Sequence, residues 1–125
     1  MDAWVEPLYS NEISKNLQVP AMFLRSEAWS TGENNPNLLS LVNGNIDESL
    51  LFQIDGTVHT DFSMAYMFDS PLAKQLKITG DNESVYLVSI LKTMITNFFD
   101  NNLKEKNTID LSTMDQKWDI VNKIN

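Results

Sequence analysis

The sequence predicts an α/β fold in which short parallel strands are flanked by helices. Two apolar runs, residues 21–24 and 50–54, have the length of strands and lack polar alternation, as strands buried on both faces do. A short helical stretch over 37–43 lies between them, so the three segments follow one another as in a βαβ unit. The clearest helical periodicity comes later, over 83–100.

Length and composition indicate one modest globular domain. The chain has 125 residues, of which 42% are hydrophobic and 10% aromatic. The net charge of -8 argues against a nucleic-acid partner, which needs a clustered basic surface. The absence of cysteine excludes disulfides, thiolate metal sites and a cysteine nucleophile. No apolar run approaches the roughly 18 residues of a membrane-spanning helix.

The first half of the chain contains both predicted strands. Pro20 introduces the first strand, and the helix after it is expected to have Asn35 as its cap and Pro36 as its first residue. Asn43-Gly44-Asn45 ends this helix. The second strand stops at the turn Asp55-Gly56.

His59, the only histidine in the sequence, follows this second strand. A loop at the end of a buried strand is where α/β enzymes place a general base, because the sheet fixes its position. The alternative is a solvated histidine, or one whose ring bonds a nearby carbonyl. Asp61, two residues further on, is expected to be a solvated loop acid, because the short spacing makes it an awkward partner for the ring.

The second half of the chain is predicted to be helical. Ser70-Pro71 begins a short helix that runs to Leu76. The long helix over 83–100 presents one apolar face, which we interpret as packing without a cofactor role. Residues 101–125 are expected to form a polar C-terminal extension, with a marginal helix over 114–124 capped by Ser112.

Asp2 and His59 have the chain order of the last two members of a hydrolase triad. In α/β-hydrolases the order is Ser, then Asp or Glu, then His, each at the end of a strand. The acid orients the imidazole, and the imidazole takes the proton of the serine. A solvated carboxylate near the chain terminus is the alternative for Asp2.

Local sequence sharpens this hypothesis. Asp2-Ala3-Trp4 followed by Pro7-Leu8, then the strand PAMFLRSE and the segment GTVHTDF, resembles the C-terminal part of the platelet-activating-factor acetylhydrolases, which are phospholipase A2-type α/β-hydrolases. The resemblance covers about residues 1–100 and does not extend beyond Asn101. Thr57 stands where that family often has serine, and Glu6 where it commonly has an apolar residue.

The resemblance implies a role for four residues. Asp2 corresponds to the triad acid and His59 to the triad base. Trp4 is placed at the wall of the substrate pocket, with core packing as its alternative, and Phe62 behind the histidine loop. The implied substrate is a phospholipid or a small ester. Neither a metal nor a cofactor is implied, and lipid-surface contact is expected to be transient and made by a full-length parent.

The triad serine is missing from the pattern. No Gly-x-Ser-x-Gly nucleophile elbow occurs in the sequence. We therefore expect residues 1–100 to be the C-terminal part of a hydrolase domain with an incomplete sheet, whose serine lies upstream of Met1. Two functions stay open, a serine-dependent ester hydrolase and a non-catalytic truncated remnant or packing module. Secreted and cytoplasmic locations also stay open.

Overall fold

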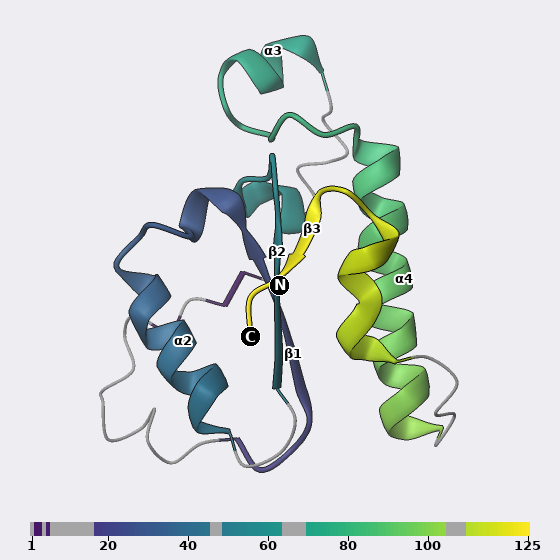
Figure 1. The fold of residues 1–125 in the computed structure, drawn as a ribbon. Coiled ribbons are helices and arrows are strands. Elements are labelled where there is room, and N and C mark those ends of the chain that lie inside the picture. Colours follow the sequence, from purple (N-terminus) through teal and green to yellow (C-terminus); the bar gives the residue numbers. More distant parts are fainter. Residues whose placement is uncertain (1, 4, 6–16, 46–48, 64–69, 105–109) are drawn as a thin grey trace.

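A small mixed sheet forms the centre of the protein. The computed structural model describes residues 2–3, 5, 17–45, 49–63, 70–104 and 110–125. The strand order is β1 (Ala21–Ser26), β2 (Ser49–Ile54) and β3 (Val121–Lys123). β1 and β2 are parallel, whereas β3 pairs antiparallel with β2 (Figure 1). The two predicted strands and their parallel pairing are therefore confirmed.

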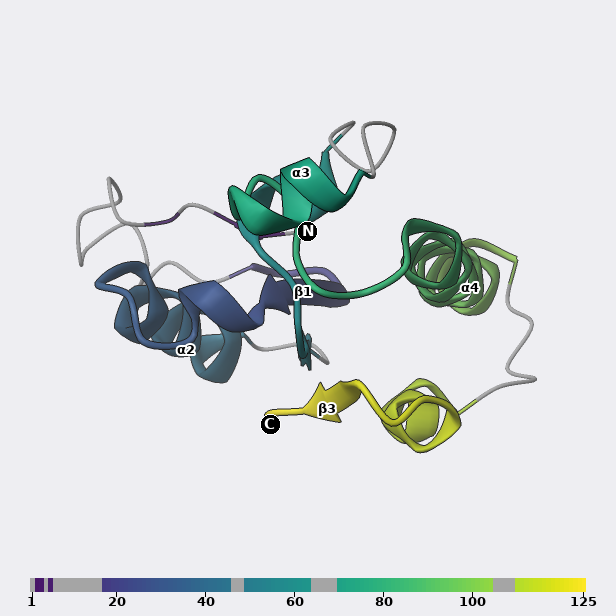
Figure 2. The ribbon, with the colours of Figure 1, turned by 90° about the horizontal axis from the view of Figure 1, so that it is seen from above.

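Helices cover both faces of this sheet. α2 (Asn34–Gly44) lies on one side and α4 (Ser84–Leu103) on the other, as the view from above shows clearly (Figure 2). β2 supplies both apolar clusters, since successive side chains of a strand point to opposite faces. Its fully buried Leu51 packs with α2, and its fully buried Phe52 packs with α4. The arrangement is compatible with part of an α/β fold.

α2 begins two residues earlier than the sequence suggested. Its first residue is Asn34, and Glu33 occupies the N-cap position without a side-chain capping bond. The predicted cap at Asn35 is therefore wrong. Pro36 is tolerated inside the first turn, where backbone N–H groups have no intrahelical partner in any case. The side chain of Asn34 is hydrogen-bonded to backbone outside the helix.

Two of the three helices predicted in the second half are present. α3 (Pro71–Gln75) starts after Ser70, whose hydroxyl accepts a hydrogen bond from the N–H of Ala73 at 3.1 Å. α4 presents Leu87, Ile90 and Met94 to the core. Within the described ranges, no helix combines the length and the apolar character needed to traverse a bilayer.

The C-terminal segment differs from its prediction. Instead of a helix over 114–124, the chain forms the 3-10 helix η4 (Leu111–Lys117) and then β3. η4 lies beside α4 in both views (Figures 1 and 2), and its Leu111 and Met114 are buried in the same core as Val121. The cap is Asp110 and not Ser112. The segment is extended at its end because the free edge of β2 offers backbone partners there.

Candidate active site

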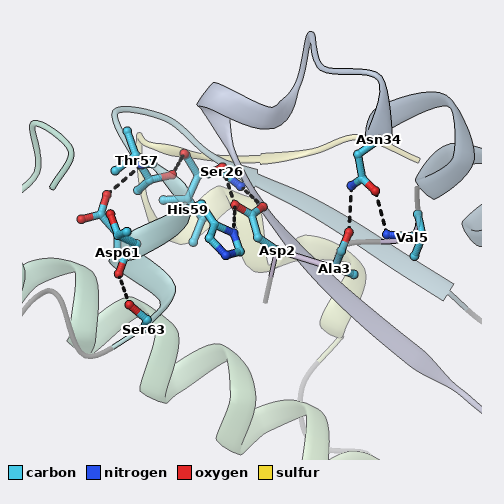
Figure 3. Close-up of polar contacts among 12 residues, drawn as sticks. Asp2, Ala3, Val5, Ser26, Asn34, Thr57, His59, Asp61 and Ser63 are labelled. Atoms are coloured by element: carbon cyan, nitrogen blue, oxygen red, sulfur yellow. Dashed lines mark hydrogen bonds and ion pairs between the residues drawn. The ribbon is translucent and has the colours of Figure 1, made fainter. Parts of the chain in front are cut away.

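The candidate site lies at the carboxyl ends of β1 and β2. These ends are neighbours because the strands are parallel, with Ser26 opposite Ile54 in the register. After β2 the chain turns at Gly56, whose φ of 68° is in the left-handed region. The 3-10 helix η2 (His59–Phe62) then begins with His59 and brings its imidazole over the end of β1 (Figure 3).

Asp2 and His59 face each other across this edge. The imidazole Nδ1 lies 3.4 Å from the Asp2 Oδ2. This is longer than an ideal hydrogen bond, but catalytic contacts are often long in free enzymes and tighten when substrate binds. The side chain of Asp2 is fully buried, whereas 52% of the imidazole is exposed. One ring nitrogen therefore faces the acid, and much of the ring is open to an incoming group.

The Asp2 carboxylate is held by Ser26, the last residue of β1. The Ser26 N–H donates to Oδ1 at 2.6 Å, and the Ser26 hydroxyl donates to Oδ2 at 2.5 Å. A buried carboxylate needs such donors, because its desolvation is otherwise costly. The solvated terminal carboxylate that was the alternative for Asp2 is not observed.

Asn34 anchors the rest of the segment that carries the acid. Its amide nitrogen donates to the carbonyl of Ala3 at 2.8 Å, and its amide oxygen accepts from the N–H of Val5 at 2.7 Å (Figure 3). The first residue of α2 thus forms a two-point clamp on this strip of backbone. Although Asp2 is near the chain end, its position is set by two separate elements.

The residues that follow β1 contact the histidine loop. The indole of Trp29 stacks on the imidazole of His59, with ring centroids 4.5 Å apart and an interplanar angle of 7°. The Glu27 carboxylate accepts from the N–H of Gly56 at 2.7 Å, and the N–H of Ala28 donates to the carbonyl of Thr57 at 3.3 Å. The 3-10 helix η1 (Glu27–Trp29) therefore ties β1 to the loop.

Asp61 is not the solvated loop acid expected from the sequence. It is buried, and its Oδ2 accepts from the N–H of Val58 at 2.8 Å. The N–H of Gly80 lies 3.1 Å from Oδ1 and 2.9 Å from Oδ2. The carboxylate thus fastens η2 to the backbone that precedes α4. The prediction failed because Gly80 is distant in sequence and comes close only in the fold.

The family model of platelet-activating factor acetylhydrolase, isoform II, matches residues 1–122. The chain belongs to this family. Its membership supports a hydrolase-like function, and the match also runs through the C-terminal segment, where the sequence had shown no likeness beyond Asn101. No curated protein matches the chain.

Of the two residues predicted to line the substrate pocket of this acetylhydrolase family member, the structure describes one. Trp4 lies outside the described residues. Phe62 ends η2 and is packed against the α4 core. It also lines an apolar cavity of about 220 Å³ beside α4, together with Val88, Leu91 and Ile95. His59 is not among the residues that line this cavity.

A buried cation lies near the acid of this family member. Arg25 precedes Ser26, and its guanidinium donates to the amide oxygens of Asn35 and Gln53, the latter at 2.6 Å. Burial lowers the pKa of Arg25, and the negative charge of Asp2 acts in the opposite direction. Among the described residues, no group of three His, Asp or Glu side chains is placed to hold a metal ion.

Sequence reasoning missed three residues of the site: Ser26, Trp29 and Asn34. Ser26 carried a usable signal, because it lies two residues after an apolar run and so at the same sheet edge as His59. Trp29 and Asn34 carried none, since each acts on a residue about 30 positions away. Such contacts depend on how β1 and α2 are arranged in the fold.

Proposed function

We propose that Asp2 and His59 are the acid and the base of a serine-dependent carboxylic ester hydrolase. The proposed activity resembles that of platelet-activating factor acetylhydrolase, in which a short acyl group is released from a phospholipid. The observation that carries the proposal is the 3.4 Å contact between the buried Asp2 carboxylate and Nδ1 of an imidazole that is half exposed. Family membership over residues 1–122 supports the same class of chemistry.

In this proposal each ring nitrogen has its own role. With Nδ1–H directed at the carboxylate, Nε2 keeps its lone pair and can accept a proton. A serine hydroxyl attacks the ester carbonyl carbon and passes its proton to Nε2, and Asp2 stabilises the imidazolium that forms. The proton then goes to the leaving alkoxide as the ester bond breaks. Water, deprotonated by the same imidazole, then attacks the acyl-serine carbonyl carbon, and the imidazolium returns the proton to the serine oxygen as the carboxylic acid leaves.

The nucleophile of this proposal is a serine outside the 125 residues. The sequence contains no Gly-x-Ser-x-Gly elbow. Ser26 is the serine bonded to the acid, but it is fully buried and its hydroxyl is engaged by Asp2. It therefore supports the acid and is unsuited to attack a substrate.

The absence of an elbow also favours a second candidate function. A chain with an acid and a base but no nucleophile could act as a non-catalytic packing module, a truncated remnant of such a hydrolase. In that case the contact between Asp2 and His59 would be retained from the parent fold and would have no catalytic role.

Reading the coding DNA upstream of Met1 in frame separates the two candidates. If it encodes a Gly-x-Ser-x-Gly segment, the extended protein should hydrolyse a short-acyl phospholipid, and its serine should react with a fluorophosphonate probe. In-frame stop codons without such a segment would overturn the hydrolase proposal for this gene and favour the packing module.

Variants of the extended protein then test the two residues. Asp2→Asn should lower kcat by about 10⁴-fold, because the imidazole would be held in the wrong tautomer. His59→Ala should lower it at least as much. Asp81→Asn alters an exposed carboxylate of the same chain and should leave activity unchanged. Full activity in His59→Ala would refute the assignment.

A further inference from the structure

We infer that Ser26 and Trp29 are positioning residues that hold the acid and the base in register, an inference that rests on the proposed function of Asp2 and His59. Four consecutive residues, 26–29, each make one connection across the site: Ser26 to Asp2, Glu27 to Gly56, Ala28 to Thr57 and Trp29 to His59. One short segment therefore fixes both partners of the pair.

Trp29 restrains the ring that the acid alone leaves loose. The contact between Nδ1 and Oδ2 is long, and 52% of the imidazole is exposed, so that contact allows rotation about the histidine side-chain bonds. A parallel indole at 4.5 Å covers one flat face of the ring and opposes this rotation. An aromatic face also attracts a cation, so the same stack favours the imidazolium that forms during proton transfer.

Ser26 restrains the other partner. Its N–H and hydroxyl donate to different oxygens of Asp2, which fixes the plane of the carboxylate as well as its position. The oxygen that accepts the hydroxyl proton is also the one that faces His59. Loss of the Ser26 hydroxyl would leave that oxygen with the imidazole as its remaining described partner.

The single histidine makes the inference directly measurable. In the chain as it exists, with ¹⁵N-labelled histidine, the carbon-bound ring protons of His59 should be shifted upfield by the indole ring current. Nδ1 should carry the proton. Trp29→Ala should remove the upfield shift and raise the rate of modification by diethyl pyrocarbonate by about 5- to 10-fold, the equivalent of one lost aromatic stack.

Conservative variants distinguish loss of the stack between Trp29 and His59 from a general loss of the fold. Trp29→Phe should keep most of the upfield shift, whereas Trp29→Leu should lose it while filling similar space. Trp118→Phe, which alters a partly buried indole packed against the core beside α4, should leave the His59 signals unchanged. Ser26→Ala should keep the ring-current shift but reduce the population protonated at Nδ1.

These readouts require neither a serine nor a substrate, so they are independent of the proposed activity. Unchanged ring-proton shifts and an unchanged modification rate in both Trp29→Ala and Trp29→Leu would overturn the positioning role. An inactive extended protein with the expected His59 signals would instead overturn only the hydrolase proposal. In an active extended protein, Trp29→Ala should lower kcat about 10-fold with little change in KM.

Discussion

Two buried carboxylates lie at the same edge of the sheet but serve different purposes. Counted over the whole residue, Asp2 is 8% exposed and Asp61 is 5% exposed, so the two acids hardly differ in burial. Asp2 accepts from Ser26 and turns one oxygen toward the His59 imidazole. Asp61 accepts from the backbone N–H groups of Val58 and Gly80. A buried acid becomes a catalytic candidate only when an oxygen faces a group that can exchange a proton.

The difference also lies in what each carboxylate connects. Asp61 joins two stretches of backbone, and such bonds have no function other than to fix a loop. Asp2 joins the end of β1 to a side chain that is accessible to solvent. We therefore expect changes around Asp61 to affect the free energy of unfolding most, and changes around Asp2 to affect the state of the imidazole.

The largest effect is expected from Gly80→Ala, which would break the Asp61 contact. An added Cβ would lie 2.6 Å from the Asp61 Oδ2 and 2.9 Å from the Cα of Thr57, and it would clash with the carbonyl of Gly56. Backbone atoms cannot give way cheaply, so the free energy of unfolding in urea should fall by about 3 kcal/mol. Gly32→Ala is the matched control, since its nearest neighbour would be 3.8 Å away. Equal stability of the two variants would contradict the steric argument.

Asp61→Ala should have the next largest effect. It leaves the buried N–H of Gly80 and the partly buried N–H of Val58 without their acceptor, which should cost about 2–3 kcal/mol in urea unfolding. Asp61→Asn keeps one oxygen that both N–H groups can reach, so it should cost about 1 kcal/mol. If the two variants are equally stable, the carboxylate does not act as a backbone acceptor.

Asp2→Asn tests the other half of the comparison. The amide oxygen can still accept from the Ser26 N–H, so the free energy of unfolding should change by about 1 kcal/mol or less. The amide nitrogen would face Nδ1 and favour the tautomer protonated at Nε2. The ¹⁵N spectrum of His59 should therefore show the proton moving between the ring nitrogens. An unchanged tautomer would mean that Asp2 does not control the ring.

The smallest effect on stability is expected from substitution of Asp110. This residue has the same kind of partners as Asp2 but is exposed. Its Oδ1 accepts from the hydroxyl of Ser112 at 2.6 Å and from the Ser112 N–H at 2.9 Å. These bonds lower the pKa of Asp110 below its usual 3.8. A lowered carboxyl pKa stabilises the fold above that value, and this contribution is lost as the pH falls through the folded pKa.

The stability difference between the wild type and Asp110→Ala should therefore be present near neutral pH and shrink in acid. Thermal unfolding of both proteins from pH 7 down to pH 2 measures it. A difference that grows as the pH falls would refute the assigned sign. Asp2 also accepts from the N–H and the hydroxyl of a serine, but it is buried. A comparison of Asp110 with Asp2 would therefore show how burial changes the contribution of these two hydrogen bonds to the free energy of unfolding.

Much of the scaffold could be predicted because its signals are local. The apolar runs of β1 and β2 and the periodicity of α4 are each contained within one element. The apolar run of β2 placed His59 directly after a strand, and chain order and local sequence then suggested Asp2 as its partner. β3 could not be predicted, since a strand of three residues, Val121–Lys123, has no periodicity of its own.

The sequence by itself determined which segments become buried strands and helices, and it supplied a histidine directly after a buried strand and an acid upstream of it in the chain order of a triad. Tertiary structure alone decided that Asp61 holds backbone, that Asn34 clamps the acid segment and that Trp29 stacks on His59. The physical reason is distance along the chain. Local patterns record the burial of a segment, whereas each of these contacts joins residues that are distant in sequence and become neighbours only in the folded chain.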